Sequence, residues 1–179
     1  MSDAYGLAHA YTITGKQYSG DYIISAAVTW NQGANGYRLP TEAEREYACR
    51  AGSTTAFCDG ATTDTLCGQL DPDLDRVGWY CGNAGGATHP VKDKQPNAWG
   101  LYDMHGNVWE WCWDTWDGSD YGSGPATDPT GRRWETGVRI VRGGYWNADA
   151  RDCRSAVRRG GITSVIYYSI GLRVARTAP

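Results

Sequence analysis

Long apolar runs are missing from this sequence of 179 residues. No stretch approaches the roughly 20 apolar residues that a membrane-spanning helix needs. The first residues also lack the basic and apolar regions of a secretory signal peptide. We therefore expect no membrane span in this chain, and the sequence does not specify an export route.

Recognisable catalytic motifs are missing too. The only histidines are His9, His89 and His105, which are scattered along the chain. There is no G-x-S-x-G nucleophile elbow, no H-E-x-x-H zinc motif and no phosphate-binding loop. These absences argue against the common hydrolases, zinc proteases and nucleotide-dependent enzymes.

Phenylalanine is nearly absent, with one residue against 12 tyrosines and 9 tryptophans. Glycine is abundant at 24 residues. This composition indicates a loop-rich fold with amphipathic aromatic side chains, which are enriched in recognition surfaces. The length suits one compact domain over residues 1–179.

The cysteines show no metal-binding spacing, since there is no C-x-x-C and no histidine at zinc-site distance. An even count is compatible with disulfides, but buried free thiols are equally ordinary. Cys58 and Cys67 bracket a polar loop and are predicted to be able to pair, whereas Cys112 and Cys153 are predicted to face one another. The redox state stays open. The six cysteines are Cys49, Cys58, Cys67, Cys81, Cys112 and Cys153.

Charge is distributed unevenly behind a net charge of −3. From Arg139 onward there are eight arginines, two aspartates and no lysine or glutamate. A basic tail can bind nucleic acid. However, these arginines are spaced along predicted strands, which favours structural arginines bonded to carbonyls and carboxylates over a phosphate-binding patch. We expect no nucleic-acid partner.

Residues 97–116, NAWGLYDMHGNVWEWCWDTW, are the stretch around which the rest is organised. Alternating tryptophans at its centre have the period of a strand with one face buried, so we predict that these indoles form the core. Asp103 and Glu110 flank a Gly-Asn-Val turn, and carboxylates beside backbone carbonyls suit calcium. The alternative is an acidic turn that caps backbone amides. Its tryptophans are Trp99, Trp109, Trp111, Trp113 and Trp116.

Before this stretch, strands are predicted within residues 11–15 and 21–30. Thr41 begins a helix over residues 41–50, because Thr41 and Glu44 have capping-box spacing. Residues 53–95 are predicted to form a long loop region of the kind that is functional or tied down. Its D-P-D-L-D segment at residues 71–75 is interpreted as a solvated acidic turn, with a calcium loop as the alternative.

After it, residues 117–138 form another loop, residues 139–146 a strand, and residues 171–174 the last strand, closing the sheet beside the first. The segment of residues 160–169 admits two interpretations. A plain buried strand fits its aliphatic residues. An exposed recognition loop fits its tyrosines and serines, and we favour it.

Three motifs, in residues 37–52, 97–116 and 142–173, resemble the sulfatase-modifying-factor domain, the family of the formylglycine-generating enzyme. The resemblance implies an α+β variant of the C-type lectin fold, with a small antiparallel sheet, one or two helices and extensive loops. Members usually have tryptophan where Arg45 stands, so packing there must differ. The resemblance also implies a structural calcium ion held by Asp103, Glu110 and the carbonyls of Gly106 and Val108, which favours the metal interpretation of the turn.

The family's enzymes use two cysteines, separated by four residues, to bind copper and activate oxygen. The first position is Ala148 here and only Cys153 remains. A single thiolate is a poor copper(I) site. We therefore predict that the chain is not an enzyme. A formylglycine-generating oxidase and a structural module of a larger machine are the alternatives.

The tail also resembles the variable region of proteins diversified by retroelements, in which adenine-directed mutagenesis changes residues between fixed positions. From residue 145 to 169 there is no Lys, Glu, Gln or Met, and the only tryptophan is Trp146. The diversified codons derive from AAC and end in C, and codons that end in C cannot encode Lys, Glu, Gln, Met or Trp. The resemblance predicts inward-pointing Trp146, Arg154 and Arg158, and a protein or glycan ligand on another cell or virus surface. The predicted ligand-facing patch comprises Tyr145, Asn147, Asp149, Arg151, Asp152, Val157, Arg159, Gly161, Ile162, Ser164, Tyr167 and Tyr168.

Overall fold

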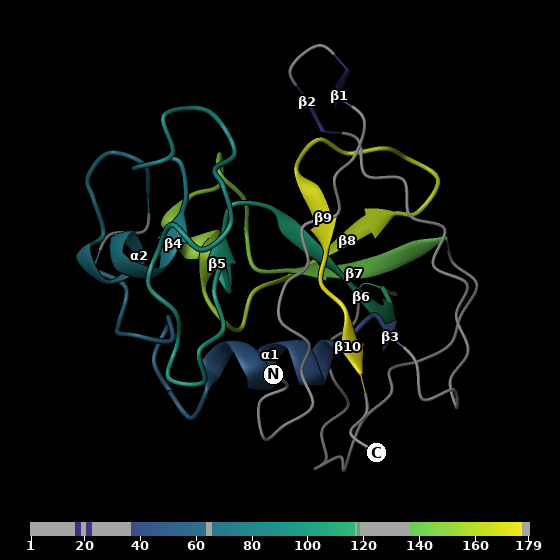
Figure 1. Ribbon diagram of the computed structural model, residues 1–179, viewed down its shortest axis with the longest axis horizontal. Coiled ribbons are helices and arrows are strands. Elements are labelled where there is room, and N and C mark those ends of the chain that lie inside the picture. Colours follow the sequence, from purple (N-terminus) through teal and green to yellow (C-terminus); the bar gives the residue numbers. More distant parts are fainter. Residues whose placement is uncertain are drawn as a thin grey trace.

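The computed structural model describes residues 37–63, 66–116, 118 and 137–176, together with two short strands at residues 17–18 and 21–22 (Figure 1). Most of the strands predicted within residues 11–30 lie outside the described residues, and so does the loop predicted at residues 117–138 apart from residues 118, 137 and 138. The elements are β1 (Gln17–Tyr18), β2 (Asp21–Tyr22), β3 (Tyr37–Arg38), α1 (Glu42–Arg50), α2 (Pro72–Val77), β4 (Gly78–Trp79), β5 (His105–Gly106), β6 (Trp109–Thr115), β7 (Val138–Arg142), the 3₁₀ turn η1 (Ala150–Cys153), β8 (Arg158–Ile162), β9 (Ile170–Leu172) and β10 (Ala175–Arg176).

Helix α1 begins where the capping box predicts it. The Thr41 hydroxyl accepts a hydrogen bond from the Glu44 N–H at 3.2 Å, and the Glu44 carboxylate accepts one from the Thr41 N–H at 2.7 Å. The helix ends at Arg50 because Ala51 takes a left-handed conformation with φ 47°. It packs against β6 and β7, so it covers one face of the main sheet.

The main sheet has four strands in the order β8-β7-β6-β9. The β8–β7 and β7–β6 pairs are antiparallel as predicted, whereas β9 lies parallel to β6. The sheet curls, and β8 approaches β9: a Cβ built on Gly161 would lie 3.4 Å from the Ile170 side chain. The predicted last strand, residues 171–174, coincides in part with β9, and a further strand that was not predicted, β10, follows it and pairs antiparallel with β3 (Figure 1).

Strand β6 has the predicted period, but the prediction of its buried face holds only for Trp109 and is wrong for Trp111 and Trp113. Trp109, Glu110, Cys112 and Asp114 are buried, whereas Trp111 and Trp113 are half-buried on the face opposite Glu110. The reason is α1, which brings the Arg45 guanidinium to Glu110 and the Glu42 backbone N–H to Asp114 on the inner face of β6. The indoles instead pack on the other face of the curled sheet, where a Cβ on Gly161 would lie 2.6 Å from Trp111.

Residues 53–95 are tied down by a second small core. Phe57, Leu74, Val77 and Tyr80 are buried there, packed against Ala148, Ala150 and Cys153 from the η1 region. The segment of residues 71–75 is not a solvated turn. Asp71 is fully buried and caps α2, accepting hydrogen bonds from the backbone N–H groups of Asp73 and Leu74.

The cysteine pairing differs from the prediction. Cys67 forms a disulfide with Cys81, 14 residues later, and Cys58 is free. Cys112 and Cys153, which were predicted to face one another, are both buried free thiols. The spacing of the cysteines along the sequence could not predict the Cys67–Cys81 disulfide, because packing of the second core brings Cys81 back to Cys67. Among the described residues, no helix combines the length and apolarity needed to cross a bilayer.

Candidate binding surface and candidate metal site

The predicted ligand-facing positions are mostly accessible. Six are exposed: Asn147, Arg151, Arg159, Ile162, Ser164 and Tyr168. Five are half-buried: Tyr145, Asp149, Asp152, Val157 and Tyr167. Gly161 is buried, which corrects its assignment to an exposed patch, because its Cα faces the Trp111 ring.

The end of β8 and the connection to β9 expose large apolar side chains. Exposed fractions are 47% for Ile162, 45% for Val165, 74% for Ile166 and 65% for Tyr168. Residues 163–169 are therefore an exposed loop, not a buried strand, whereas residues 160–162 of the predicted segment form the end of β8. Val165 and Ile166 were missing from the predicted patch; the signal was there, since aliphatic residues in an exposed loop have no core to enter.

Aromatic contacts connect this loop to the segment before η1. The Trp146 ring lies 6.2 Å from Tyr168 and 6.0 Å from Tyr145, and Tyr145 in turn lies 6.4 Å from Trp109. Trp146 is half-buried within this row, so the prediction that it enters the core is wrong. Tyr167 meets Trp111 edge-on at 6.5 Å, anchoring the loop on the curled sheet.

The charges of the surface are paired locally. Arg151 lies 2.9 Å from the Asp149 carboxylate and Arg159 lies 2.8 Å from Asp152, which connects β8 to η1. Arg154 is exposed and donates to the Arg151 carbonyl at 2.7 Å, which corrects its predicted inward orientation. Burial, followed by the charges of Tyr168, Asp152 and Asp149, raises the pKa of the Tyr145 hydroxyl.

Behind the surface lies a buried ion-pair network that fixes the strands. Arg142 lies 2.6 Å from Glu42 and 2.8 Å from Glu46, and Arg158 lies 2.7 Å from Glu42. These contacts attach β7 and β8 to helix α1. The predicted structural role of the tail arginines is confirmed for Arg142 and Arg158, since both bond to carboxylates.

The predicted metal ligands lie in a second part of this network. Both Glu110 oxygens accept hydrogen bonds from guanidinium groups, of Arg45 at 2.6 Å and of Arg173 at 2.8 Å. Burial alone would raise the pKa of Glu110, but the charges of Arg173 and Arg45 lower it. Arg173 also donates to the Asp103 carbonyl at 3.3 Å, which brings Asp103 beside Glu110.

The carboxylate and carbonyl oxygens at this site are the ligand types that a hard cation such as calcium prefers. Asp103 is buried in a left-handed conformation with φ 55°, and its Oδ1 has no hydrogen-bond partner. Burial raises the pKa of Asp103, as expected for a carboxylate without its full set of partners. Gly106 is required by packing, since a Cβ there would collide with the Trp79 carbonyl. Glu110, however, would share its carboxylate between the ion and two arginines, so the site at Asp103, Gly106, Val108 and Glu110 stays a prediction.

The positions that correspond to the family's cysteine pair lie in the second core. Ala148 and Cys153 are both buried. Burial raises the pKa of the Cys153 thiol well above its ordinary value, followed by the charge of Asp152, so the thiolate that binds copper is disfavoured.

A few short helices, small sheets and one curled sheet with long connections define a mixed α+β protein of the C-type lectin type, in the variant found in formylglycine-generating enzymes. Residues 4–178 match the model of the sulfatase-modifying factor enzyme 1-like domain, and the chain belongs to that family.

The relatives include both enzymes and proteins of other kinds. Variable protein 1 of Treponema denticola has a TM-score of 0.71 and 35% identity, over 82% of this chain and 49% of that one. The formylglycine-generating enzyme of Streptomyces coelicolor is 34% identical over 84% of this chain and 52% of its own length. The chaperone protein LppX of Paenibacillus barcinonensis is 38% identical over 69% and 43%. The chain thus spans about half the length of these relatives.

Proposed function

We propose that this chain is a non-enzymatic ligand-binding protein whose residues 145–169 form a hypervariable surface diversified by a retroelement. The observation that carries the proposal is the exposed apolar surface formed by the end of β8 and the loop that follows it. Four large apolar side chains (Ile162, Val165, Ile166 and Tyr168) are exposed within seven residues. Contiguous exposed apolar surface marks interaction sites more often than chance.

The division between framework and surface supports this proposal. Framework side chains such as Arg142 and Arg158 enter ion pairs with α1, whereas Asn147, Ser164 and Tyr168 are exposed. Exposed positions change at a cost near ±0.5 kcal/mol, while core changes cost about 2–5 kcal/mol. A surface can therefore vary without loss of the fold. The similarity to a Treponema variable protein favours the same use.

The ligand is a protein or a glycan on another cell or virus surface. Apolar and tyrosine side chains supply contact area at low entropic cost, which suits a protein ligand. The test is to sequence the DNA beside the coding region. We expect a reverse-transcriptase gene and a near-copy of the codons for residues 145–169 that differs at adenines. A neighbourhood without either would contradict the proposal.

A formylglycine-generating oxidase is the second candidate, because related chains carry that name. The alanine at position 148 and the buried thiol of Cys153 argue against it. Purified chain, supplied with copper(I), oxygen and a sulfatase-type cysteine peptide, should leave the peptide unchanged by mass spectrometry. Conversion of the peptide cysteine to formylglycine would establish the oxidase instead.

A further inference from the structure

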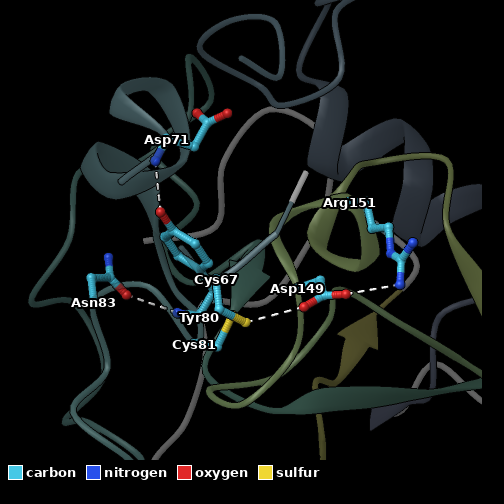
Figure 2. The surroundings of a disulfide bond; sticks show 7 residues. All are labelled: Cys67, Asp71, Tyr80, Cys81, Asn83, Asp149 and Arg151. Carbon is cyan, nitrogen blue, oxygen red and sulfur yellow. Dashed lines mark hydrogen bonds and ion pairs between the residues drawn. A yellow bond between two sulfur atoms is a disulfide. The ribbon is translucent and has the colours of Figure 1, made fainter. Parts of the chain in front are cut away.

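The disulfide of Cys67 and Cys81 lies beside a carboxylate. The Cys67 sulfur is 3.1 Å from the Asp149 Oδ1, and ligand atoms of all three residues lie within 4.8 Å of one another. Cys67 is exposed and the other two are half-buried, so an ion can enter from solvent. Figure 2 shows the Asp149 carboxylate between the disulfide and the Arg151 guanidinium.

We propose that the reduced chain binds one zinc ion at Cys67, Cys81 and Asp149, with water as the fourth ligand. Thiolate and carboxylate ligands together suit zinc, and three protein ligands plus an open position form a common zinc arrangement. This site is separate from the predicted calcium site. It shares Asp149 with the proposed ligand-facing patch, but zinc binding by the reduced chain does not require the binding function proposed above.

The chemistry balances with a dithiol or phosphine reductant. The reductant supplies two electrons, the sulfur–sulfur bond breaks, and the two sulfurs take up two protons. Zinc then replaces these protons on the thiols. At zinc–sulfur distances of about 2.3 Å and zinc–oxygen distances of about 2.0–2.2 Å, the two sulfurs must separate to about 3.8 Å. The Cα atoms are 5.3 Å apart, which leaves room for that movement.

Two of the three ligands are positioned without help from the disulfide. The Cys81 N–H donates to the Ala148 carbonyl at 3.1 Å, immediately before Asp149. The neighbouring Tyr80 is buried, and its hydroxyl accepts a hydrogen bond from the Asp71 N–H at 2.7 Å (Figure 2). Breaking the disulfide therefore frees Cys67 but leaves Cys81 beside Asp149.

The Asp149 carboxylate is also oriented. Its Oδ2 lies 2.9 Å from Arg151, while Oδ1 is directed toward the Cys67 sulfur. Outer partners that hold a ligating carboxylate are typical of metal sites and set its direction. In the described part of the chain, these are the only three His, Cys, Asp or Glu side chains whose ligand atoms converge in this way.

The test compares the oxidised and the phosphine-reduced full chain, without oxygen, in a zinc titration against a chromophoric chelator. We expect one zinc per reduced chain and none on the oxidised chain. Cobalt in place of zinc should give thiolate-to-metal absorption. Asp149→Asn should weaken zinc binding about tenfold or more, whereas the matched Asp152→Asn and Cys58→Ser variants should not change it.

Several results would overturn the proposal. They are no zinc on the folded reduced chain, equal binding by the oxidised chain, or binding that survives Cys67→Ser with Cys81→Ser. If reduction unfolds the chain, zinc should restore its near-ultraviolet circular dichroism, because binding and folding are coupled. A reduced, unfolded chain whose near-ultraviolet circular dichroism does not recover with zinc would also contradict the proposal.

Discussion

A methyl group added to Gly161 would lie 2.6 Å from the Trp111 ring. We expect Gly161→Ala to lower the free energy of unfolding by about 1–3 kcal/mol, because the ring and strand β8 must shift to relieve the overlap. Urea denaturation measures this loss. Ser164→Ala, at an exposed position two residues after β8, is the matched control and should stay within about 0.5 kcal/mol. Equal stability of both variants would show that Gly161 belongs to the exposed variable surface after all.

Glu110 neutralises two buried guanidinium groups. Replacing it by glutamine should lower the free energy of unfolding by about 3–5 kcal/mol near neutral pH, since Arg45 and Arg173 stay buried without a counter-charge. Asp59→Asn breaks the exposed pair with Arg76 and should cost less than about 1 kcal/mol.

The same residue predicts a pH dependence. The pKa of Glu110 is lowered in the folded state, so its stabilising effect is fully present above the ordinary glutamate pKa of 4.5. The effect is lost as the pH falls below that value, through the lowered folded-state pKa. Unfolding measured from neutral pH to acid should therefore show a smaller difference between the parent and Glu110→Gln at the acid end. A constant difference would contradict the ion-pair explanation.

Strand β6 shows what a single element's sequence can and cannot predict. The alternation of residues 109–113 correctly gave a strand, because period two belongs to the extended backbone itself. It could not give the buried face, since burial depends on what packs there, and α1 brings Arg45 from 65 residues before Glu110. The capping of α1 was predictable because its partners, Thr41 and Glu44, are three residues apart.

The β8–β9 connection should change without loss of stability. We expect Ile166→Ser combined with Tyr168→Ser to change the free energy of unfolding by about 0.5 kcal/mol or less per site and to weaken ligand binding. Tyr145→Ala should destabilise the fold instead, because Tyr145 packs against the second core. Thermal unfolding and a binding assay separate the two effects. A clear fall in melting temperature for the double variant would assign the loop to the core.

The predicted calcium site at Asp103, Gly106, Val108 and Glu110 would join the turn before β6 to β6 itself. Through the contact of Glu110 with Arg173 it would also join the C-terminal segment. An ion that binds only the folded chain adds about 2.7 kcal/mol at a concentration one hundred times its dissociation constant. Millimolar calcium should therefore raise the melting temperature relative to a chelator, and Asp103→Asn should remove the shift. No shift in the parent chain would show that Arg45 and Arg173 already supply the positive charge at Glu110.

At the scale of the molecule, family motifs were enough to predict the fold class, since three of them lie in order along the chain. The disulfide and the second core were not predictable in this way. Residues 53–95 show little periodicity, and the Cys67–Cys81 contact depends on packing against Ala148 and Ala150, far along the chain. Contacts of this kind are set by the tertiary fold alone.

Strands β8 and β9 hold the two ends of the exposed loop on opposite edges of one curled sheet. Pairing with the neighbouring strands fixes these two ends, so the length of the loop is a separate variable. Doubling the length of a flexible loop adds only about 0.6 kcal/mol to the cost of closing it. Natural relatives and designed libraries can therefore use insertions after Thr163, and not substitutions alone, so that a longer loop contacts ligands with deeper binding surfaces.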